Sequence, residues 1–219
     1  MTRSIEVTIE ATPKRTFASA ANWPGWSRSG KTEELALEAL AASAARYADV
    51  ASAAGVDFPA SVTLADLHLV GRNDGGAGTE FGVPSHPSDR DRRSLDAAGA
   101  ARLVAIVRAS WELFDRTAAA APRELRKGPR GGGRDTWKIV DHVLDADRAY
   151  ANELGIKVNQ PSADDRRAIE ALRTAVLEVL GSARDGEPIA GRRWPARYAA
   201  HRIAWHALDH AWEIEDRSS

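Results

Sequence analysis

The chain has 219 residues, of which 43% are hydrophobic, and its 30 basic and 31 acidic side chains leave a formal net charge of −1. This balance gives no overall attraction to nucleic acid or to an anionic membrane surface. The sequence contains no cysteine, which excludes disulfides, thiolate catalysis and cysteine-ligated zinc. No apolar run approaches the roughly 20 residues of a membrane span, and the start of the chain lacks a signal-peptide core, so we expect a cytoplasmic protein.

An alternating pattern opens the chain. Ile5, Val7 and Ile9 are apolar, whereas their neighbours within residues 4–12 are mostly polar, which is the period of a half-buried strand. A Thr-Pro-Lys turn signal follows. Residues 15–23 are then predicted to form a second strand that pairs with the first as a hairpin.

A loop, a helix and a third strand are expected next. Residues 23–30, WPGWSRSG, contain two Gly and one Pro and are predicted to form the loop. Thr32 provides a cap for a helix with acidic residues in its first turn, and Gly55 provides its C-terminal stop. Residues 61–70, SVTLADLHLV, are predicted to form a strand that completes the sheet.

The two strands followed by WPGWSRSGKTEELALEAL resemble a HicB-type module over residues 1–50. In that family the module often forms the toxin-neutralising part of an antitoxin, so the resemblance implies binding to a protein partner. We find no appended helix-turn-helix or ribbon for DNA binding. A small α+β accessory domain is the alternative interpretation. Residues 1–72 are assigned to this HicB-like module.

The rest of the chain is predicted to be a linker and a helical domain. Residues 73–93 are rich in Gly, Asp, Ser and Pro without apolar periodicity, which is typical of a linker. Residues 94–219 carry four apolar-faced helical patterns, at residues 95–121, 136–155, 161–180 and 193–216. The predicted fold class is therefore α+β, with a small N-terminal sheet-plus-helix module followed by an up-down four-helix bundle.

Two histidines in the last helix point to a metal site. His206 and His210 are four residues apart, so on a helix they lie on one face and can reach one ion. His142 is expected on or beside the buried face of the second bundle helix. Without the other two histidines, His142 would be interpreted as a core histidine satisfied by one hydrogen bond. Together with the pair it predicts a three-nitrogen site with an open position, the ligand count of catalytic zinc, and zinc or nickel is the expected divalent metal.

Nearby carboxylates are candidates to orient these ligands. Asp145, Asp209 and Glu213 lie at spacings from which they can accept the second ring N–H of a histidine. A zinc-protease helix is excluded, because such a motif needs Glu directly after the first histidine and this chain has Ala207 there. His201 is expected outside the site, since five residues place it about 140° around the helix from His206.

A second resemblance concerns the helical domain. The stretches WKIVDH with DADRAY, and later WHALDH, resemble the DinB-like superfamily of four-helix metalloproteins over residues 95–219. That superfamily includes thiol-dependent S-transferases and mycothiol-dependent maleylpyruvate isomerases. The resemblance implies a metal triad of His142, His206 and His210. It also implies a low-molecular-weight thiol as cofactor and a small electrophile as substrate.

Several functions stay open at this level. The chain is expected to be a thiol-dependent transferase or isomerase, with a non-enzymatic metal-stabilised binding module and an antitoxin-like interaction protein as alternatives. No nucleic-acid or membrane partner is expected, and a homodimer is left open. The basic connection KGPRGGGR, residues 127–134, is interpreted as a flexible solvated loop, with phosphate binding as the alternative.

Overall fold

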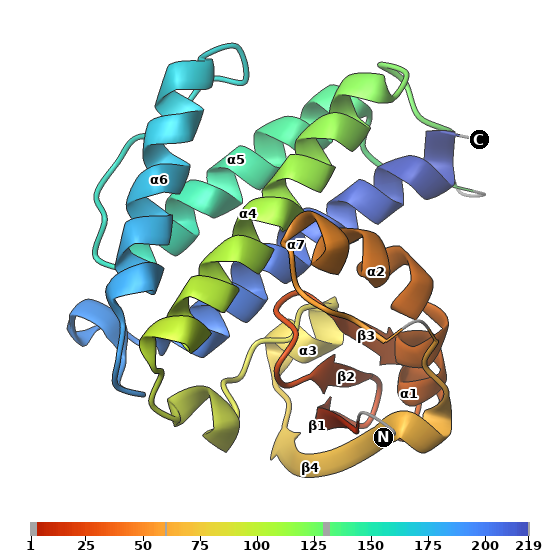
Figure 1. The fold of residues 1–219 in the computed structure, drawn as a ribbon. Helices are drawn as coiled ribbons and strands as arrows, with labels where there is room; N and C mark the ends of the chain where they lie inside the picture. Colours follow the sequence, from red (N-terminus) through yellow and green to blue (C-terminus); the bar gives the residue numbers. More distant parts are fainter. Residues whose placement is uncertain (1–3, 60, 129–131, 219) are drawn as a thin grey trace.

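A computed structural model describes residues 4–59, 61–128 and 132–218. Its strands are β1 (Ile5–Ala11), β2 (Thr16–Ala20), β3 (Ser27–Gly30) and β4 (Leu67–Asp74). Its helices are α1 (Glu33–Ala42), α2 (Ala44–Ala53), α3 (Ala77–Phe81), α4 (Ala97–Ala120), α5 (Thr136–Glu153), α6 (Arg166–Ser182) and α7 (Ala196–Ser218). Short 3-10 turns are η1 (Leu64–Asp66), η2 (Asp89–Arg92) and η3 (Ile189–Gly191). The predicted α+β class is confirmed (Figure 1).

The four strands form one sheet in the order β3-β2-β1-β4. The predicted hairpin is present, because β1 pairs with β2 antiparallel. Its alternation also holds, since Ile5, Val7 and Ile9 are at most 3% exposed. The last strand, β4, pairs with β1 in parallel, with a register shift between Val7 and Thr8. α1 packs against β2 and β3, and α2 contacts α4 (Figure 1).

Two strand predictions need correction. Residues 27–30, expected within a loop, form β3 and pair with β2. The turn before β3 is closed by Gly25 at φ +87, a conformation that favours glycine. The strand expected at residues 61–70 runs instead from Leu67 to Asp74, because β4 takes its register from β1. Pairing with a distant strand therefore overrides the local composition.

The single helix expected from Thr32 to Gly55 is interrupted. Thr32 does cap α1, accepting the backbone N–H of Leu35, but the helix ends at Ala42 and α2 begins after Ser43. At the break the Leu40 carbonyl accepts the indole N–H of Trp26 at 3.1 Å and the Ser43 hydroxyl at 2.8 Å. These side-chain donors occupy a carbonyl at the end of α1, where the helix is interrupted.

The C-terminal helices pack as the predicted four-helix arrangement. α4 contacts α7 and α6, and α5 contacts the same two helices. Their shared core is aliphatic and rich in alanine on α7, where Ala199, Ala204, Ala207 and Ala211 are at most 1% exposed. Small side chains let neighbouring helices approach α7 closely. Among the helices that the structure describes, none is long and apolar enough to cross a membrane.

A second core joins the sheet to the bundle. It contains buried residues of the sheet, α1 and α2 together with Ile106 and Ala109 of α4 and Leu208 and Trp212 of α7. Trp26 and Tyr47 stack within it, with ring centroids 5.4 Å apart. The N-terminal residues thus cover one side of α4 and α7 with apolar surface.

Residues 73–93, expected as a linker, include the end of β4, the short helix α3 and the turn η2. They are tied to β1 by the buried carboxylate of Glu10. This carboxylate accepts the backbone N–H groups of Ser85 and His86, each at 3.0 Å, and the hydroxyl of Thr79. Hydrogen bonds to a buried carboxylate hold this stretch against the sheet.

A buried polar cluster of Asp147, Trp111 and Arg173 joins α5, the helix that carries His142, to α4 and α6. Asp147 is 3% exposed and accepts the indole N–H of Trp111 of α4 at 3.1 Å. Its other oxygen lies 3.7 Å from Nε of Arg173 of α6, which also donates to Asp115 at 2.6 Å. Burial raises the pKa of Asp147 to about 6, and the Arg173 charge partly opposes that rise.

Replacement of Leu208 tests the core that the sheet shares with the helical bundle. Leu208→Ala should lower the free energy of unfolding by about 2–5 kcal/mol, because the side chain is fully buried in the shared core. Leu35→Ala is the matched control, since Leu35 is 47% exposed and its loss should cost about 0.5 kcal/mol or less. Urea denaturation measures both. Equal effects of the two replacements would contradict the packing of the N-terminal residues on α7.

The raised pKa of Asp147 predicts how the free energy of unfolding depends on pH. The pKa of Asp147 is higher in the folded than in the unfolded chain, so its contribution to stability falls as pH rises from about 4 through about 6. Asp147→Asn removes that ionisation. Its stability relative to wild type should therefore increase by about 2 kcal/mol between pH 4 and pH 7. Urea denaturation across this range is the measurement, with Asp145→Asn at an exposed site of α5 as control. A stability difference that does not change with pH would contradict the raised pKa.

Candidate metal centre

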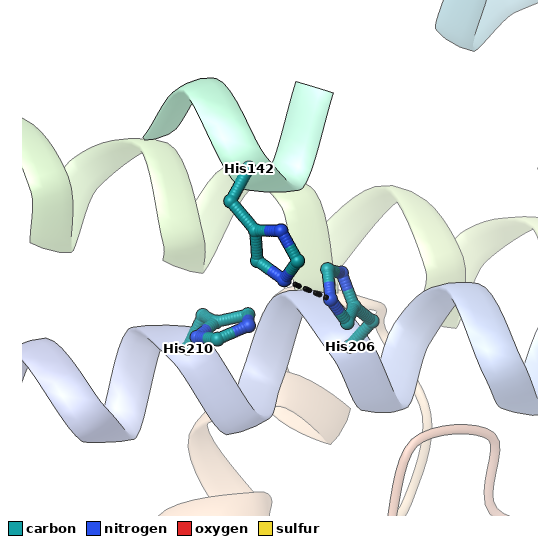
Figure 2. Close-up of side chains that lie close together, drawn as sticks. All are labelled: His142, His206 and His210. Atoms are coloured by element: carbon teal, nitrogen blue, oxygen red, sulfur yellow. Dashed lines mark hydrogen bonds between the residues drawn. The ribbon is translucent and has the colours of Figure 1, made fainter. Parts of the chain in front are cut away.

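Two helices supply the three predicted ligands. His206 and His210 lie on α7, where both are buried at 7% and 8% exposure. His142 lies on α5 and is partly exposed. Figure 2 shows the His142 ring extending from α5 toward α7, with the rings of His206 and His210 beneath it. The contact between α5 and α7 therefore brings the three imidazoles together.

The nitrogen atoms of the three rings are close enough to share an ion. One nitrogen from each ring lies within 4.8 Å of the other two. The Nε2 atoms of His142 and His206 are 3.2 Å apart (Figure 2). Two zinc–nitrogen bonds of about 2.0–2.1 Å at a tetrahedral angle would separate their nitrogens by about 3.4 Å. His142, His206 and His210 thus could hold a divalent ion.

The surroundings of His142 and His206 favour the neutral form of these two rings. The pKa of His206 is well below its usual value, mainly because the ring is buried and then because His210 and His142 are adjacent. Burial, followed by the nearby His210, also lowers the pKa of His142. A neutral imidazole has a free lone pair for a metal, whereas a protonated one has none. These two rings are consequently available as ligands near neutral pH.

Glu213 orients one of the rings. Its Oε2 atom accepts the Nδ1–H of His210 at 2.8 Å, which leaves Nε2 of His210 as the ligand atom. Its Oε1 atom accepts a hydrogen bond from Arg217 at 2.6 Å. The pKa of Glu213 is lowered, first by the hydrogen bond from His210, so the carboxylate remains charged.

The other two candidate carboxylates contact arginines. Asp145 accepts two hydrogen bonds from Arg148, at 2.8 and 3.1 Å. Asp209 pairs with Arg28 of β3 at 3.4 Å. Among the described residues, neither carboxylate forms a hydrogen bond with a histidine, so Glu213 alone of the three has the expected contact. His201 lies apart from the cluster and donates from Nε2 to the Ala21 carbonyl at 3.1 Å.

Two further residues border the site without having been predicted. The ring of Tyr150 lies 5.7 Å from that of His206, edge to face. Arg202 donates to the Tyr150 hydroxyl at 3.1 Å, and its Nη1 atom is buried without a hydrogen-bond partner among the described residues. Arg202 is four residues before His206, and this spacing in the sequence could have indicated a shared helix face.

Comparisons with known proteins do not identify the chain. No family model matches it, and no curated protein or solved structure gives a significant match. The resemblances to HicB-type and DinB-like proteins therefore stay predictions from the sequence. The description of the site rests on its geometry.

The contact between Glu213 and His210 predicts an effect on metal affinity. Glu213→Ala should weaken Zn²⁺ binding by about 10–100-fold, because His210 would lose the partner that fixes its ring and tautomer. Asp145→Ala is the matched control and should bind Zn²⁺ like wild type, since its carboxylate contacts Arg148 instead. Calorimetric titration of metal-free protein measures both. Equal affinity of the two variants would contradict the role of Glu213.

Proposed function

We propose that the chain is a divalent-metal protein of the DinB-like type, which uses a low-molecular-weight thiol to transfer or isomerise a small electrophile. The observation that carries the proposal is the convergence of His142, His206 and His210 from two helices. Three protein ligands are the usual number at catalytic zinc sites, whereas structural sites use four. Imidazole ligands favour zinc or nickel over calcium or magnesium.

The thiol must come from outside the protein. The sequence contains no cysteine, so no side chain can supply a sulfur nucleophile. A divalent metal held by the three histidines would lower the pKa of a thiol bound to it. The three histidines would hold the metal, and Glu213 would keep His210 in the tautomer that offers Nε2 as a ligand.

Tyr150 and Arg202 give the site groups for substrate positioning. Burial raises the pKa of Tyr150, so its hydroxyl keeps a proton that can be donated to a substrate oxygen. Arg202 already donates to this hydroxyl and retains a free N–H group at Nη1 within the described chain. Both residues can therefore orient a polar electrophile beside the histidines.

Removal of single ligands tests metal binding. His142→Ala, His206→Ala and His210→Ala should each lose most of the zinc or nickel that copurifies with the wild-type protein, since two ligands hold the ion poorly. His68→Ala is the matched control, because His68 is an exposed histidine of β4. Elemental analysis by mass spectrometry, with circular dichroism to check folding, is the measurement. Wild-type protein that takes up neither metal would contradict the proposal.

Thiol-dependent chemistry is a separate test. Metal-loaded protein should accelerate consumption of small electrophiles when mycothiol or cysteine is added, and His206→Ala should not. Rates with and without thiol, measured over a panel of electrophiles, distinguish a thiol-dependent enzyme from a non-enzymatic binding module. Metal-loaded protein that neither binds nor transfers a thiol would favour the non-enzymatic binding module.

A further inference from the structure

An open cavity of about 910 Å³ lies at the C-terminal end of α7, next to the metal centre. It is lined by Arg126, Lys127, Glu213 and Arg217 and by Gly128, Gly132 and Gly133 of the α4–α5 loop. Small-molecule sites have volumes of about 300–1,000 Å³. The cavity is therefore large enough for a metabolite.

The charges around this cavity are mostly positive. Arg126 donates its Nη2 to the main-chain oxygen of Asp216 at 2.8 Å and has no carboxylate partner within the described chain. Lys127 pairs with Asp135, which does not line the cavity. Glu213 is the one acid among the lining residues and is bonded to both Arg217 and His210. The lining thus has more cationic than anionic groups.

Arg217 is held in place by two of its three side-chain nitrogens. It donates from Nη1 to Glu213 at 2.6 Å and from Nε to the Arg126 carbonyl at 2.9 Å. Its Nη2 atom is buried and has no hydrogen-bond partner among the described residues. A cation near a helix C-terminus is favourable by itself. That effect does not require a buried donor left without an acceptor, which is costly until a ligand accepts from it.

The loop is shaped around this guanidinium. Gly133 has φ +114, and a Cβ atom at that position would lie 2.5 Å from Nη2 of Arg217. The N–H of Gly128 donates to the Gly132 carbonyl at 2.9 Å, which holds these two lining glycines close together. Glycine is therefore required at 133 both by its backbone conformation and by the close approach of Arg217.

The cavity is connected to the metal centre through Glu213. One carboxylate oxygen accepts from Arg217, which lines the cavity, and the other accepts from His210. This carboxylate and the His210 ring therefore link the cavity guanidinium to the candidate ligand atom, Nε2 of His210. A ligand anchored in the cavity would thus lie beside the site where chemistry is proposed.

We propose that Arg126 and Arg217 form a binding site for an oxyanion, the carboxylate or phosphate group of a small molecule. Guanidinium groups suit both anions, because their N–H donors match a pair of acceptor oxygens. The site uses no metal ligand, so it does not depend on the proposed function.

Titration of full-length protein with inorganic phosphate and with succinate tests the site and distinguishes phosphate from carboxylate binding. At least one anion should bind to metal-free protein, with an affinity that falls as salt increases. Arg126→Gln should weaken binding about tenfold or more, because a charge-assisted hydrogen bond is lost. Arg108→Gln is the matched control, since Arg108 is an exposed arginine of α4 outside the cavity. Arg126 is exposed, so its replacement should leave thermal unfolding unchanged.

Gly133→Ala provides a second variant that keeps both arginines. It should weaken anion binding, because the added methyl group displaces the Arg217 guanidinium. Absence of binding to the wild-type protein, or equal affinity of Arg126→Gln and Arg108→Gln, would overturn the proposal. So would binding seen only in metal-loaded protein, since the anion would then occupy the metal. Elemental analysis of the same samples reports on the metal centre separately.

Discussion

Packing of α7 on two sides at once determines where the sheet and the histidines lie. Its alanine-rich side, with Ile203 and Ile214, belongs to the core of the helical bundle. Leu208 and Trp212 belong to the core shared with the sheet, α1 and α2. Burial of apolar surface on both sides fixes the rotation of α7 about its axis. His206 and His210 are consequently directed at α5.

Electrostatics link the metal centre to its surroundings. The three imidazoles bring no negative charge to an ion, and Glu213 is the only acidic group bonded to them in the part of the chain that the structure describes. Arg202 and Arg134 both lower the pKa of His206, after the larger effects of burial and the other two rings. A divalent ion here would be only partly neutralised, so an anionic ligand such as a thiolate or a carboxylate would be stabilised.

Most of the differences between prediction and structure originate in long-range contacts. The break at Ser43 depends on the indole of Trp26, and β4 takes its register from β1. Helical spacing placed Asp209 near the histidines, but Arg28 of β3 binds this carboxylate instead. Asp145 is an exception, because its partner Arg148 is three residues further along the same helix. A side chain with several partners in reach takes the one that tertiary packing brings closest, and sequence spacing does not reveal that choice.

The sequence by itself determined the features that depend on local geometry. The alternation of Ile5, Val7 and Ile9 indicated a strand, and a repeat of 3.6 residues per turn placed His206 and His210 on one helix face. Tertiary structure decided the rest. His142 joins the pair because α5 packs on α7, and Gly133 meets Arg217 because the chain returns to the same place 84 positions later. Such contacts follow from the burial of apolar surface between distant segments, which no local pattern specifies.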